Sequence, residues 1–167
     1  MLGYVFVQSG RVAEGLPLLQ EALSALEAMA MFQWRSHVQV HLGEAYLLAR
    51  RPTDALAVAE SCLILTRERG HRGYEAWTLR LLGEIASHHD RPDVAKAEAH
   101  YDAAVTLASE LEMRPLVAHC HLGFADLCRW SGEQRKAQQH LTTATSIYRE
   151  LDMRSWLEKA ERTKVLQ

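Results

Sequence analysis

The chain repeats itself with a nearly constant period, and this regularity limits its fold more than any other feature. Small residues recur at Gly15, Ala55, Ala97 and Ala137, and the steps between them are 40, 42 and 40. A mostly bulkier side chain follows each of them four residues later, and another small or compact one follows seven residues later. Positions i, i+4 and i+7 share one face of an α-helix, so this face lets a neighbouring helix approach closely. A period of roughly 20–50 residues indicates a stack of repeated units.

A second series of small residues runs in the same phase and locates an insertion. It consists of Gly3, Gly43, Gly83 and Ala125, and its steps are 40, 40 and 42. The longer step of 42 residues falls between residues 55 and 97 in the first series and between residues 83 and 125 in the second. The two extra residues therefore lie between residues 83 and 97, which both steps include. We therefore expect the insertion in the turn around His89–Pro92 and not in a helix.

The positions of proline and the absence of alternating strand patterns predict an all-α protein. Pro52, Pro92 and Pro115 each fit the first turn of a helix, where the missing N–H costs little. Pro17 falls inside an expected helix, where we expect a late start or a bend. The expected helices span residues 1–9, 12–30, 33–50, 53–70, 73–89, 93–112, 115–131, 134–151 and 154–166.

One segment carries a recognisable motif. Residues 42–46 read Leu-Gly-Glu-Ala-Tyr, and Ala55, Ala59 and Cys62 follow. This arrangement resembles the signature of tetratricopeptide (TPR) repeats, although those repeats usually have about 34 residues. The longer period is similar to that of kinesin light chains and of bacterial maltose-activator-type regulators. The resemblance implies one domain over residues 1–167, a right-handed superhelical solenoid of about four helix pairs (about 1–30, 31–70, 71–112 and 113–152) with a C-terminal capping helix (153–167).

The C-terminal third carries a narrower resemblance. Residues 112–123 and 140–158 look like the repeats that end large bacterial signalling proteins, in which a nucleotide cyclase or regulatory domain precedes an NTPase module. This similarity implies that the chain is, or derives from, the C-terminal sensor or scaffold end of such a protein. The chain has no GxxxxGK[ST] phosphate-binding loop, so the resemblance implies no nucleotide chemistry here.

In TPR proteins the first helix of each pair lines the concave surface, where peptides bind. The residues of this chain that occupy equivalent positions around Gly43, Gly83 and Ala125 form the predicted binding face. Among them the acidic row Glu44, Glu84 and Asp126 recurs once per repeat, so we expect it to run along the groove. The predicted face comprises His37, Val40, Glu44, Leu47, Trp77, Arg80, Glu84, His88, His119, Leu122, Asp126, Arg129 and Trp130.

The acidic row favours a protein or peptide partner that carries Lys or Arg, with Trp77 and Trp130 as apolar anchors. The alternative is that the three acids are solvated positions on their helices, with their charges balanced by neighbours such as Arg80 and Arg129. Exposed charges of this kind would contribute little to binding. The main functional hypothesis is a non-catalytic interaction or scaffold module. Self-assembly through the edge of the N-terminal helix and sensing of a small effector are the other two.

Enzymatic and metal chemistry find little support. His37, His41 and Glu44 share a helix face at i, i+4 and i+7, a spacing that can bind zinc, but surface and inter-helix polar histidines are the favoured explanation. No nucleophile with a base, no paired carboxylates in a pocket and no glycine-rich phosphate loop stands out. We therefore expect no catalytic residue, no metal and no cofactor.

Charge and hydropathy exclude further classes of function. The formal net charge is −2, so a phosphate-neutralising nucleic-acid surface is not expected. No apolar stretch approaches the ~18 residues of a membrane span, and the first residues lack the features of a secretion signal. Three cysteines without a CxxC pair fit a reducing compartment, so a cytoplasmic location is expected. The first helix is short on the N-terminal side of Gly3, so we expect either a longer native chain or a second copy covering its apolar face.

Overall fold

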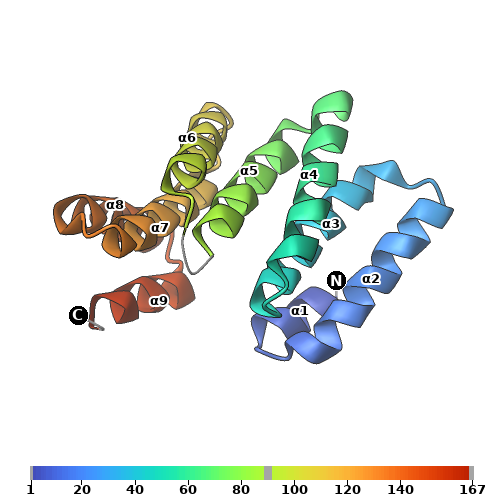
Figure 1. Ribbon diagram of the computed structural model, residues 1–167, viewed down its shortest axis with the longest axis horizontal. Coiled ribbons are helices and arrows are strands. Elements are labelled where there is room, and N and C mark those ends of the chain that lie inside the picture. Colours follow the sequence, from blue (N-terminus) through green and yellow to red (C-terminus); the bar gives the residue numbers. More distant parts are fainter. Residues whose placement is uncertain (1, 89–91, 166–167) are drawn as a thin grey trace.

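The computed structural model describes residues 2–88 and 92–165, without the side chains of residues 32, 33 and 163–165. The described part of the chain contains nine helices and no strand, which confirms the predicted all-α repeat fold (Figure 1). The helices are α1 (Leu2–Gln8), α2 (Val12–Ala28), α3 (Phe32–Leu48), α4 (Pro52–Arg69), α5 (Arg72–Ser87), α6 (Val94–Glu110), α7 (Arg114–Trp130), α8 (Gln134–Glu150) and α9 (Arg154–Val165). The right-handed superhelical sense of the stack stays a prediction.

All helix ends lie within two residues of the predicted boundaries. The late start predicted for the second helix is wrong, because α2 begins at Val12 and includes Pro17. The proline lies only one turn and a half into the helix, and its missing N–H removes a single hydrogen bond, to the carbonyl of Ala13. The bend predicted as the alternative stays a prediction.

The longest link between helices lies where the insertion is predicted. Residues 88–93 join α5 to α6, whereas residues 9–11, 49–51 and 131–133 make the corresponding links of the other pairs. Residues 89–91 lie outside the described part of the chain. At the end of this link the Asp93 side chain accepts a hydrogen bond from the backbone N–H of Lys96 (3.1 Å) and so caps α6.

The helices pack in sequence order, and alternate ones also contact each other. Each helix contacts the next along the chain, and α1, α3, α5 and α7 form a continuous inner layer through contacts of α1 with α3, α3 with α5 and α5 with α7. In Figure 1, α1 and α9 lie at the same edge of the molecule although they are at opposite ends of the chain. The inner layer therefore brings both ends of the stack towards one face.

The stripe of small residues predicted from the sequence is buried between helices. Ala55, Ala97 and Ala137 are all buried on α4, α6 and α8, where they face the inner layer. On α6 the bulky member of the stripe, Tyr101, is held between two glycines of the inner layer. A Cβ at Gly83 would lie 2.7 Å from the Tyr101 ring, and one at Gly123 would lie 2.6 Å from its phenol end. Glycine at both positions is thus required for this contact.

The turns that join one pair to the next repeat a single backbone conformation. Ala30, Gly70, Glu112 and Asp152 have φ of 53°, 67°, 54° and 52°, the left-handed conformation that commonly ends helices. The steps between them are again 40, 42 and 40, so the turns follow the period of the sequence. Only one of the four is glycine, so three turns hold a side chain in a region that disfavours it. None of the described helices is both long and apolar enough to cross a membrane.

Candidate functional site

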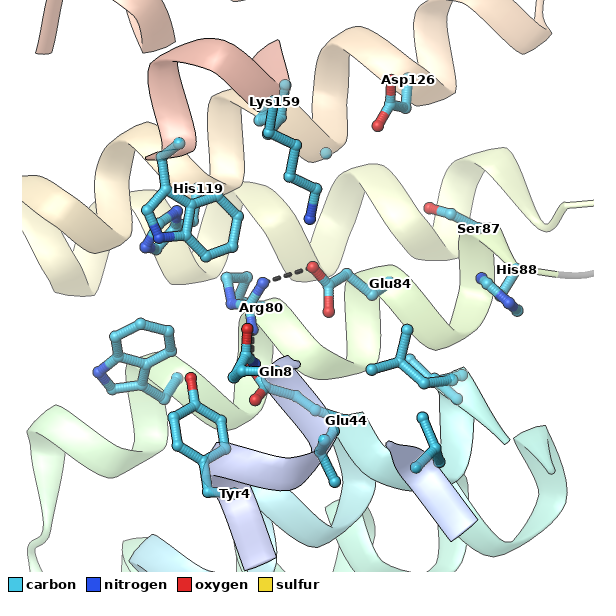
Figure 2. A pocket seen from close by; sticks show the side chains of 18 of the residues that line it. Tyr4, Gln8, Glu44, Arg80, Glu84, Ser87, His88, His119, Asp126 and Lys159 are labelled. Carbon is cyan, nitrogen blue, oxygen red and sulfur yellow. Dashed lines mark hydrogen bonds and ion pairs between the residues drawn. The ribbon is translucent and has the colours of Figure 1, made fainter. Parts of the chain in front are cut away.

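A cavity of about 650 Å³ lies against the inner layer, between α1 at one end and α9 at the other (Figure 2). Its walls come chiefly from α1, α3, α5, α7 and α9, with Tyr101 of α6 reaching it from behind. Nine of the thirteen residues of the predicted face line it: Glu44, Leu47, Trp77, Arg80, Glu84, His88, His119, Leu122 and Asp126.

The other four predicted residues lie elsewhere. Val40 is buried in the interior. The ring of His37 contacts those of His41 and Tyr74. Arg129 and Trp130 lie at the C-terminal end of α7, where Arg129 forms an ion pair with Asp126 (3.0 Å). Trp130 is 55% exposed and does not line the cavity.

The acidic row runs along the cavity, with one carboxylate from each of α3, α5 and α7. Arg80 of α5 lies between the first two, and its two terminal nitrogens donate separately to Glu44 and to Glu84 (Figure 2). Arg80 is only 5% exposed, so the guanidinium is buried although the Glu84 carboxylate keeps some contact with solvent. Two carboxylates share one guanidinium, which leaves an excess of one negative charge.

Burial and charge affect the two carboxyls differently. Burial acts to raise the pKa of Glu44, but a hydrogen bond from His41 Nδ1 (3.2 Å) and the charge of Arg80 outweigh it and lower that pKa. For Glu84 burial prevails over the attraction of Arg80, and its pKa is raised. Burial alone would lower the pKa of Arg80, but Glu84 and Glu44 raise it, so the guanidinium stays charged. Glu84 is therefore the less well compensated of the two acids.

An aromatic wall of Trp77, His119 and Trp156 adjoins the acidic row. The centroid of the His119 ring lies 5.7 Å from that of Trp77 and 4.2 Å from that of Trp156. Its Nδ1 shares a hydrogen bond with the Tyr148 hydroxyl (2.7 Å). Burial, assisted by the charge of Arg80, lowers the pKa of His119 to about 3, so this side chain is neutral at physiological pH. The aromatic wall therefore presents uncharged rings to a ligand in the cavity.

The helix α9 adds a cation to the cavity. Lys159 lines it, with its ammonium 4.5 Å from the centroid of the Trp156 ring. Figure 2 shows its side chain reaching from α9 towards Glu84. Burial raises the pKa of Asp126, and the charges of Arg129 and Lys159 act against that rise.

Sequence reasoning missed the residues that the two ends of the stack contribute. Tyr4 of α1 follows Gly3 as Glu44 follows Gly43, so extending the same rule to the first repeat would have found it. Lys159 of the capping helix lies seven residues after Asp152, as Trp77 lies seven after Gly70 and His119 seven after Glu112, so the same rule extended to this helix would have found it too. Trp156 lies one turn earlier on the same helix.

A second hollow has a volume of about 430 Å³. It is lined at the N-terminal ends of α5 and α7 by residues 71–74, Trp77 and Met113. Gly73 and Met113 make part of its wall apolar. Trp77 therefore contributes to the lining of both hollows.

The described residues hold no cluster of three or more His, Cys, Asp or Glu side chains that could bind a metal ion. His41, one of the residues with zinc-compatible spacing, instead bonds Glu44. Burial raises the pKa of all three thiols, that of Cys120 to about 12, which makes them weak nucleophiles.

A comparison of the chain with models of protein families and with curated proteins gave no match.

Proposed function

We propose that this protein is a non-catalytic binding module that holds a segment of a partner protein in the cavity of the inner layer. The observation that carries the proposal is the cavity itself, in which the acidic row adjoins an aromatic wall. Its volume lies within the roughly 300–1,000 Å³ typical of binding pockets. The resemblance to TPR repeats, and to the repeats that end bacterial signalling proteins, supports a role as scaffold.

The chemistry of the lining supports a partner segment with Lys or Arg. The three carboxylates of the acidic row face Arg80, Arg129 and Lys159 of this chain, so an incoming cation would compete with one of these three for its carboxylates. Trp77 and Trp156 each carry a cation of this chain, the Arg80 guanidinium at 5.1 Å and the Lys159 ammonium at 4.5 Å from the ring centroid, as expected of rings that attract such groups. The three free, buried cysteines fit a reducing compartment, so we place the module in the cytoplasm.

Tryptophan fluorescence provides a direct test. Trp77 and Trp156 line the cavity, whereas Trp34 and Trp130 are exposed outside it. A variant with Trp34→Phe and Trp130→Phe keeps only the two reporters of the cavity. Acetylated hexapeptide pools with one central arginine should change its emission saturably, and pools with glutamine at that place should do so less. Equal responses to both pools, or no saturable response, would refute the proposal.

A pair of charge variants tests the location of the site. Asp126→Asn removes a carboxylate of the cavity, and Glu60→Gln removes an exposed one from α4. The first should weaken binding of the arginine peptides several-fold and reduce its salt dependence, because one ionic contact is lost. The second should leave both unchanged. Identical behaviour of the two variants would place binding outside the cavity.

A small cationic effector is a second candidate, favoured by the position of the cavity between α1 and α9, which both contribute side chains to its lining. Native mass spectrometry of the protein purified from its own host distinguishes this case. A retained small molecule that the arginine peptides displace would favour an effector over a partner segment.

The apolar face of α1 favours self-association as a third candidate. Leu2 and Val5 are 61% and 58% exposed, whereas the equivalent residues Leu42 and Ala45 are buried. Sedimentation equilibrium with Val5→Glu tests it. A mass that falls from dimer to monomer would support association through α1, and a monomer at every concentration would refute it.

A further inference from the structure

The capping helix places one of this chain's own cations inside the cavity that we propose for a basic partner. The Lys159 ammonium lies over the Trp156 ring, on the side of the cavity that carries Glu84 and Asp126 (Figure 2). Burial raises the pKa of both carboxyls, and the positive charge of Lys159 opposes that rise in each. The lysine therefore acts electrostatically on both acids at once.

The two cations of the lining differ in how readily they can leave. Arg80 is buried beneath the cavity and bridges Glu44 and Glu84, so its removal would leave two carboxylates without their ionic partner. The side chain of Lys159 is exposed and joins α9 through a flexible four-carbon stem. An exposed electrostatic interaction of this kind contributes little to stability. Lys159 can therefore turn into solvent at small cost, and Arg80 cannot.

We propose that the space between the Glu84 and Asp126 carboxylates and the face of Trp156 is the subsite for one basic side chain of the partner, and that Lys159 occupies it in the free protein as an intramolecular competitor. This inference rests on the proposed function and adds to it both the position of the subsite and its regulation. The helix α9 then regulates binding in addition to capping the stack, because a partner must bind strongly enough to displace Lys159.

The chemistry of the subsite favours arginine over lysine in the partner. A guanidinium is planar, stacks on an indole face and can donate to two carboxylates at once. An ammonium is a compact, strongly hydrated charge that satisfies these contacts less fully. An arginine of the partner should therefore displace Lys159 more readily than a lysine of the partner does.

Substitutions of Lys159 in the full chain test the competition, with fluorescently labelled acetylated hexapeptides that carry one central arginine, lysine or glutamine as probes. Lys159→Gln removes the competitor and should tighten binding of the arginine peptide about twofold to fivefold, the range expected for loss of one exposed ion pair. Lys159→Arg strengthens the competitor and should weaken binding. Arg162→Gln, which removes an exposed charge from the same helix outside the cavity, is the matched control and should change nothing.

The outcomes separate this inference from the proposed function. If the unchanged protein prefers arginine over glutamine peptides but Lys159→Gln binds no more tightly than Arg162→Gln, the competition is refuted and the binding module stands. Weaker binding in Lys159→Gln has the same meaning. If the unchanged protein shows no preference among the peptides, both proposals fail. Opposite shifts in Lys159→Gln and Lys159→Arg, measured on variants with unchanged thermal unfolding, support the inference.

Discussion

Replacing Arg80 by leucine should destabilise the fold by about 3 kcal/mol at pH 7. Removing one member of a buried ion pair costs about 3–5 kcal/mol, because the remaining charge is left without compensation. Here two carboxylates, of Glu44 and Glu84, lose their common partner. The Glu84 side chain is 32% exposed and keeps some contact with water, so the lower end of the range applies.

The loss should depend on pH and should be reversible by a second change. Without Arg80 the pKa of both carboxyls rises, so protonation neutralises them more readily as the pH falls and the cost shrinks. Adding Glu44→Gln and Glu84→Gln to Arg80→Leu should recover most of the stability at pH 7, because no uncompensated charge remains.

Urea unfolding followed by circular dichroism measures these free energies of unfolding. The matched control is Arg114→Leu, which breaks an exposed ion pair with Glu150 and should cost less than about 1 kcal/mol. If Arg80→Leu costs no more than Arg114→Leu, the buried ionic cluster is not a source of stability. If the added glutamines recover nothing, the loss comes from packing of the arginine stem and the electrostatic reasoning is wrong.

Three further changes test other features, all by urea unfolding. Ala30→Gly should stabilise the fold by roughly 0.5–1 kcal/mol, because it relieves the strain of a side chain in the left-handed conformation. Gly70→Ala, at the same repeat position, should destabilise the fold by roughly the same amount. Equal changes in the free energy of unfolding in the two variants would show that these turns are unstrained. Gly83→Ala should cost roughly 1–2 kcal/mol, because its Cβ meets the Tyr101 ring and helix propensity offsets only part of the overpacking; a neutral result would mean that the ring can move aside. The folded pKa of His119, about 3, lies below its ordinary 6.5, so the unfolded chain takes up a proton that the folded chain refuses as the pH falls through this interval. The intact protein should therefore lose stability between pH 6.5 and 3, and His119→Gln should lose less; identical slopes would contradict the buried, neutral histidine.

The sequence predicted the fold closely because each repeat depends mainly on local rules. The spacing of Ala55, Ala97 and Ala137 records which helix face must be tightly packed, and proline at the first turns records where helices begin. Such signals lie within a few residues of the features that they determine, so no knowledge of distant contacts is needed. Pro17 misled the prediction because one lost hydrogen bond near a helix end is a small cost beside the packing of the whole helix.

The site was predicted only where the repeat rule applies. Glu44, Glu84 and Asp126 have equivalent positions in three repeats, and all three line the cavity. The same rule treats every repeat as having the same surroundings, so Val40 was predicted on the binding face with its equivalents Arg80 and Leu122, but unlike them it does not line the cavity. Lys159 holds the repeat position of Trp77 and His119, but its closeness to the acidic row could not be predicted, because it depends on the curvature of the entire stack. That curvature sums small rotations between neighbouring helices, which single residues do not reveal.

The cavity spans the stack from Tyr4 on α1 to Lys159 on α9, and this fixes how many repeats can lie between those two helices. An open solenoid gains binding surface with each added unit, so its length can drift by duplication of repeats. Here one more repeat of the same length would move α9 away from α1 and separate the walls of the cavity. Loss of one repeat would press them together. The number of repeats therefore determines whether this cavity can form, and a variant with a duplicated middle repeat should fold while losing the cavity.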